Sequence, residues 1–178
     1  MDFPILSSLI LLPLLGAIFI FFSKSKSNTY LTIKYLAIFV SFANFILSLY
    51  LWYLFDPSTA EFQFLEEQSW IKGFINYKVG IDGISILFII LTTFITPLCV
   101  VSVNSTIKNR LKDFLVAILV MESLMIGVFC SLDLVIFYLF FEGGLIPMFL
   151  IIGIWGGERR VYSAFKFFLY TLLGSVLM

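Results

Sequence analysis

The chain has 178 residues, of which 61% are hydrophobic and 12% charged, and its formal net charge is +0. With a mean hydropathy of +1.10, and far less charge than the roughly one quarter typical of soluble proteins, it falls in the membrane class. The balanced charge gives no indication of a nucleic-acid partner. With no histidine and only Cys99 and Cys130, the chain offers no ligand set for haem, zinc or an iron–sulfur cluster.

Six apolar windows predict an all-α transmembrane bundle, treated as one membrane domain over residues 1–178. The predicted helices cover residues 4–22, 30–55, 83–103, 113–130, 132–155 and 161–178. The loop at 56–82 shows short runs of alternating apolar and polar residues, for which a β-hairpin on the membrane surface and an irregular amphipathic loop are equal alternatives. Cys99 and Cys130 fall near opposite membrane faces, so no disulfide between them is expected.

The charged residues predict the orientation of the bundle. Basic residues gather in alternate connections, which the positive-inside rule places on the cytoplasmic or matrix side: Lys24, Lys26, Lys34, Lys108, Arg110, Lys112, Arg159 and Arg160. The 56–82 loop, with Asp56, Glu61, Glu66, Glu67 and Asp82, then lies outside, as does the N-terminus. Asp82 and Asp133 fall at helix ends, where a solvated or capping role is expected.

The stretch 132–157 carries the first candidate functional residue. It is long enough to cross a bilayer, and Glu142 lies near its middle, where a carboxylate is costly and normally faces a protein interior or a water-filled path. Pro147 frees the carbonyl of Gly143 and, with the adjacent glycines, lets the backbone bend beside the acid. Tyr138, one turn away, is positioned to hydrogen-bond it. A structural ion pair is the alternative role for Glu142.

Glu122 is the second candidate. Only residues 131–133 separate the fourth and fifth predicted helices, which should therefore be antiparallel neighbours. Glu122 lies about ten residues before this turn and Glu142 about ten after it, so both are roughly 15 Å deep. The sequence leaves open whether they share a face, and Glu122 also has a structural alternative.

The last predicted helix adds Lys166, flanked at i−4 and i+4 by Tyr162 and Tyr170. These three residues form a polar stripe that favours an inward position, the alternative being a lysine that reaches the cytoplasmic interface. Desolvation raises the pKa of a buried carboxyl group and a nearby cation lowers it. Movement of a lysine partner could therefore load and unload a proton. The three charges therefore outline a proton relay.

At these residues the sequence resembles a known family. The runs VGIDGISILFIILTTFITPL (79–98), MESLMIGVFCSLDLVIFYLF (121–140), FEGGLIPMFLIIGIWGG (141–157) and KFFLYTLLGSVLM (166–178) are similar to the antiporter-like membrane-arm subunits of proton-pumping NADH:quinone oxidoreductase, respiratory complex I. The resemblance implies a family of about fourteen helices with two inverted repeats. It also implies that an acid on helix five pairs with a lysine on helix seven to drive proton movement.

Carried over residue by residue, the resemblance assigns Glu142 to the helix-five acid, Glu122 to a helix-four glutamate and Lys166 to a helix-six lysine. It implies partners among the other membrane-arm subunits, within the lipid bilayer, with NADH and quinone used by the whole complex and no cofactor in this chain. The implied location is the bacterial inner membrane, or alternatively the mitochondrial inner membrane.

Three other identities stay open. A multisubunit Na+/H+ antiporter or a membrane-bound hydrogenase shares the acid and lysine, although the Ile-Pro-Met-Phe run after Glu142 favours complex I. The helix-seven lysine and the second repeat have no counterpart before Met178. We therefore also expect a fragment, or the product of a split or decayed gene that occupies space without pumping.

Overall fold

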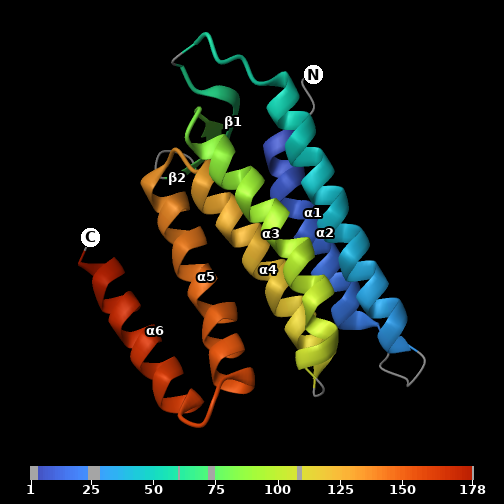
Figure 1. Ribbon diagram of the computed structural model, residues 1–178. Helices are drawn as coiled ribbons and strands as arrows, with labels where there is room; N and C mark the ends of the chain where they lie inside the picture. Colours follow the sequence, from blue (N-terminus) through green and yellow to red (C-terminus); the bar gives the residue numbers. More distant parts are fainter. Residues whose placement is uncertain (1–3, 24–28, 60, 72–74, 108–109, 178) are drawn as a thin grey trace.

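A computed structural model describes residues 4–23, 29–59, 61–71, 75–107 and 110–177. The predicted all-α fold is confirmed: α1 to α6 follow one another along the chain, with a small β-hairpin between α2 and α3 (Figure 1). The elements are α1 (Ile5–Phe22), α2 (Thr29–Leu54), β1 (Gln63–Ile71), β2 (Ile75–Ile81), α3 (Ser85–Thr106), α4 (Leu111–Cys130), α5 (Leu134–Trp155) and α6 (Arg160–Val176).

Helices α1 to α4 form a bundle, α5 packs against α4, and α6 packs against α5 at the edge of the molecule (Figure 1). The bundle contains two apolar clusters. The hairpin-side cluster comprises Leu6, Leu9, Ile10, Leu51, Val79, Ile81, Ile86, Ile89, Ile126 and Cys130. The opposite-side cluster comprises Ala17, Ile20, Ile33, Ala37, Val100, Val103, Leu115, Ile118 and Leu119. Every helix from α1 to α4 contributes to both clusters.

Large apolar side chains cover the outside of the bundle, as a bilayer-facing surface requires. Five helices, α1 to α5, are long and apolar enough to cross a membrane. The sixth, α6, has 17 residues, or roughly 25 Å at 1.5 Å per residue. A membrane location follows from the five spans.

The connections that carry the basic residues lie at the same end of the bundle, as the sequence predicts. Helices α1, α3 and α5 end, and helices α2, α4 and α6 begin, at the end opposite the hairpin (Figure 1). There Lys112 donates from Nζ to the carbonyl of Ser23 at 2.8 Å. Of the basic residues in these connections, Lys24, Lys26 and Lys108 lie outside the described residues. The side of the membrane on which this end lies stays a prediction.

The hairpin alternative for the 56–82 loop is confirmed. β1 and β2 pair antiparallel, and the register shifts by one residue between Gln63 and Glu66, where Phe64 has a positive φ of 53°. This bulge makes Glu66 oppose the fully buried Val79, a position that Leu65 would otherwise take. Glu66 consequently points toward the core side of the hairpin, where α1 begins.

Glu66 ties the hairpin to α1. Its carboxylate accepts hydrogen bonds from the backbone N–H of Leu6, at 2.9 Å, and of Ser7, at 3.1 Å, and from the Ser7 hydroxyl. The Tyr77 hydroxyl lies 3.0 Å from Ser7 Oγ and, since Ser7 gives its proton to Glu66, Tyr77 is the donor. A strand residue therefore caps the first turn of α1, whose N–H groups have no partner within the helix.

Of the solvated and capping roles left open for two aspartates, the structure shows the capping role. Asp133 accepts from the N–H of Val135 at 2.8 Å and caps α5, while Asp82 accepts from the N–H of Ser85 at 2.7 Å and caps α3. Because the Asp82 carboxylate is hydrogen-bonded by Ser85, its pKa lies below the usual value. α4 and α5 are antiparallel neighbours, as their short turn predicts (Figure 1). Both cysteines are free.

Candidate functional site

Glu122 lies inside the four-helix bundle, and its side chain is 2% exposed. It projects from α4 toward α2, where Asn44 donates from Nδ2 to Glu122 Oε1 at 2.9 Å. Asn44 is itself fully buried. The other oxygen of each group, Glu122 Oε2 and Asn44 Oδ1, is buried with no hydrogen-bond partner among the described residues. The pair is therefore only half satisfied.

This pair is part of a buried polar layer made of Asn44, Ser48, Thr93, Glu122 and Ser123. Ser48 and Thr93 share a hydrogen bond of 2.7 Å between α2 and α3, and Ser123 donates to the carbonyl of Ile10 on α1 at 2.6 Å. In α2, α3 and α4 the layer residues lie between those assigned to the two apolar clusters. The layer is thus closed by apolar side chains toward both ends of the bundle.

A groove gives the layer a lateral face. It has a volume of about 740 Å³, runs between α3 and α4 with Ile151 of α5 at its edge, and is mainly apolar. Among the described residues that line it, Glu122 is the only acid, and the others include Thr92, Thr96, Cys99, Met121 and Met125. The lining also contains Val103 and Ile118 of the opposite-side cluster, so the groove reaches the polar layer at Glu122, beside that cluster.

Glu142 occupies a different environment. It is half-buried on α5, and Ser175 of α6 donates from Oγ to Glu142 Oε2 at 2.9 Å. Tyr138 and Gly143 line a second groove of about 450 Å³ together with Glu142. No hydrogen bond joins Tyr138 to Glu142 among the described residues, where the donor to this carboxylate is Ser175; the supporting role of Tyr138 stays a prediction. Pro147 is buried within α5, which continues as one helix through it.

The two carboxylates do not share a face. Glu122 points from α4 to α2, whereas Leu124, two residues and about 200° further round α4, faces Gly143 on α5. Glu142 in turn points to α6. Helix α4 therefore separates two acids that the sequence places at the same depth, each with a neutral partner of its own.

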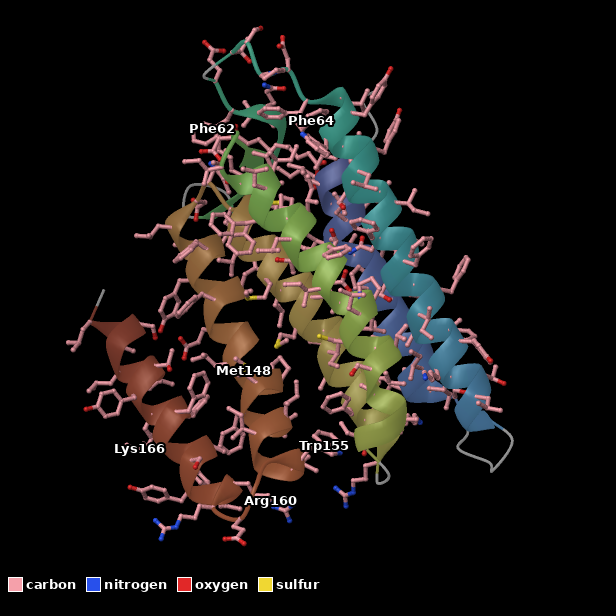
Figure 2. The ribbon with its side chains drawn as sticks, in the orientation of Figure 1. Phe62, Phe64, Met148, Trp155, Arg160 and Lys166 are labelled. Atoms are coloured by element: carbon pink, nitrogen blue, oxygen red, sulfur yellow. The ribbon has the colours of Figure 1, made fainter. Side chains whose placement is uncertain are left out.

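The polar stripe on α6 is not directed into this bundle. Lys166 is exposed, and Tyr162 and Tyr170 are 65% and 75% exposed, because α6 packs on α5 through its opposite face with Ala164 and Phe168. The predicted inward position is therefore wrong for the described chain. Figure 2 shows Lys166 in the half of α6 that also contains Arg160, away from Phe64 of the hairpin and from Phe62, which precedes β1. Lys166 meets neither glutamate.

Asn44, Ser175 and Glu66 are the partners that sequence reasoning missed. A signal was available for the first: Ser41, Asn44 and Ser48 repeat at helical spacing in an otherwise apolar segment, and all three are fully buried. No comparable pattern marks Ser175 or Glu66, whose roles depend on how α6 and the hairpin dock. No group of three metal-binding side chains occurs in the described residues.

Carboxylates at mid-depth in a polytopic helix bundle mark functional sites of membrane proteins, ion and proton pathways among them. The family model described as the transmembrane region of NADH:quinone oxidoreductase and Mrp antiporters matches residues 131–178. NADH-quinone oxidoreductase subunit M of Rhodobacter capsulatus is 58% identical over 145 residues, which is 82% of this chain and 28% of the relative.

Two further relatives agree. NADH-ubiquinone oxidoreductase chain 4 of Marchantia polymorpha is 47% identical over 97% of this chain and 35% of its own length. Subunit M of Rickettsia prowazekii is 46% identical over 99% of this chain and 36% of its own length. The resemblance to the antiporter-like subunits is thus confirmed. Among these subunits, the relatives are subunit M, or chain 4, and the similarity covers their N-terminal part. The chain spans about a third of their length.

Proposed function

We propose that this chain is the N-terminal part of a proton-translocating membrane-arm subunit of NADH:quinone oxidoreductase. In this proposal it has no redox centre, NADH and quinone react on partner subunits, and the neighbouring partners are other membrane-arm subunits in the bilayer. The observation that carries the proposal is the presence of two acids within apolar helices, Glu122 and Glu142. Almost the whole of this chain matches subunit M.

Glu142 is the proposed exchange site. It is half-buried and hydrogen-bonded to a single serine hydroxyl, beside a groove, so a proton could be exchanged there without unfolding the bundle. Lys166 would act outside the described bundle, toward a further part of the protein, because its face of α6 is uncovered here. Tyr162 and Tyr170 flank it on that face.

The test is Glu142→Gln in the full-length protein within its assembled complex. NADH oxidation and proton uptake are measured on the same sealed membrane vesicles, with Glu67→Gln, an exposed acid on β1, as the matched control. We expect fewer protons moved per NADH for Glu142→Gln and no change for Glu67→Gln. Unchanged proton uptake in Glu142→Gln would overturn the assigned role.

One observation keeps a second candidate in view, since the matching family model covers Mrp antiporters as well as the quinone oxidoreductases. Purification of the native assembly separates the two. Co-purification with subunits that oxidise NADH supports our proposal, whereas a Na+/H+-exchanging assembly without NADH oxidation supports the antiporter.

A further inference from the structure

In the buried pair of Glu122 and Asn44, each residue has one side-chain oxygen without a hydrogen-bond partner among the described residues. Asn44 Nδ2 already donates to Glu122 Oε1 at 2.9 Å, and the unpartnered atoms are the second oxygen of each group, Oε2 and Oδ1. If Glu122 were ionised, both would be acceptors with no donor between them, at a site where the two residues are 2% and 0% exposed. Buried acceptors without a donor are strongly unfavourable.

Among the described residues, no cation compensates a charge on Glu122. Helices α1, α2, α3 and α5 pack against α4, and α1 and α3 contain no acidic or basic residue. Lys34 on α2 and Lys112 on α4 each lie ten residues before a member of the pair, or about 15 Å along the helix axis. The acid on α5, Glu142, has the same sign and turns toward α6. An ionised Glu122 would therefore be an isolated buried charge.

A proton on Glu122 would both neutralise its charge and supply the missing hydrogen-bond donor. A carboxylic acid and a primary amide can join by two hydrogen bonds, the amide N–H donating to one acid oxygen and the acid O–H donating to the amide oxygen. We propose that Asn44 is a positioning residue that holds Glu122 as a neutral, protonated acid, with Oε2–H donating to Asn44 Oδ1 and Nδ2–H donating to Oε1. The bond from Asn44 Nδ2 to Glu122 Oε1 is present at 2.9 Å, and the proposed second bond joins the two oxygens that have no partner among the described residues.

This pairing gives Glu122 a different resting state from Glu142. Glu122 keeps a proton inside a layer closed toward both ends of the bundle, whereas Glu142 accepts one hydroxyl donor at the edge of the bundle. The role of Glu122 in transport rests on the proposed function, but the acid–amide pair does not. The two can therefore be tested separately.

The test is infrared difference spectroscopy on the full-length protein in its native membrane assembly, between neutral and alkaline pH in H2O and D2O. We expect a protonated-carboxyl C=O band at neutral pH that is lost in Glu122→Gln. In Asn44→Leu this band should move to higher frequency, because the acid loses its amide partner. Ser41→Ala is the matched control: it alters another buried polar residue on α2, one bonded to the carbonyl of Ile38 in its own helix, and should leave the band in place.

An exchanged pair keeps the proposal testable if Asn44→Leu does not accumulate. In Asn44→Asp/Glu122→Gln the acid and the amide trade helices, so the assembly should accumulate and a protonated-carboxyl band should persist. The proposal is overturned if Glu122→Gln removes no such band, if Asn44→Leu leaves it unmoved, or if the exchanged pair shows only carboxylate. Proton uptake is measured separately, and its loss in Glu122→Gln bears only on transport.

Discussion

Replacing Glu66 by alanine should release the hairpin from the first turn of α1. The change removes the acceptor for the N–H groups of Leu6 and Ser7 and for the Ser7 hydroxyl. Losing a helix cap costs about 1 kcal/mol and losing an anion at a helix N-terminus about 0.5 kcal/mol. With the Ser7 hydroxyl bond included, the local opening free energy should fall by about 2 kcal/mol, or about 30-fold in the opening equilibrium.

Hydrogen–deuterium exchange of the first turn of α1 measures this directly, because these N–H groups have no partner inside the helix. Glu67→Ala is the matched control on the same strand. Its carboxylate lies 3.4 Å from Lys78 Nζ with the two side chains 54% and 43% exposed, so its loss should cost under about 1 kcal/mol, at most about fivefold. Equal exchange of the first turn in the two variants would show that Glu66 does not cap α1.

The remaining predictions concern helix packing and pH. Gly127→Ala should destabilise the α4–α5 contact by about 1–3 kcal/mol, since the new Cβ would lie 2.6 Å from the ring of Phe140, whereas Gly144→Ala, with nothing within 4 Å, should not; thermal melting in detergent compares the two. Burial raises the pKa of Tyr77, with a smaller contribution from the Glu66 charge, so its contribution to hairpin docking is present below the ordinary value of about 10 and is lost as pH rises through the folded-state value. Exchange of the hairpin should therefore accelerate at alkaline pH in the wild type and less so in Tyr77→Phe. The pKa of Asp82 is lowered, so its cap stabilises α3 above the unfolded value of about 3.9 and is lost as pH falls through the folded-state value. In Asp82→Asn, the protection of the start of α3 against exchange should no longer depend on pH in that acidic range. A pH dependence of this protection that persists in the variant would be assigned to another group.

The site shows where sequence reasoning succeeds and where it stops. The depth of Glu122 and Glu142 follows from their distance to a tight turn, because the rise of a helix is fixed. Their partners do not follow, because a helical position gives a direction only relative to its own helix. Lys166 illustrates the limit: its stripe with Tyr162 and Tyr170 is real, but α6 docks through the opposite face.

The sequence by itself determined the membrane class, the helices to within a few residues, the antiparallel α4–α5 pair and the position of two aspartates at helix ends. These depend on composition, on the length of apolar runs and on contacts between residues close in sequence. Only the tertiary structure decided that a bulge turns Glu66 onto α1, that Asn44 meets Glu122 across 78 positions, and that Ser175 donates to Glu142. Each of these depends on how separate helices rotate and dock, which is set by the packing of many side chains at once.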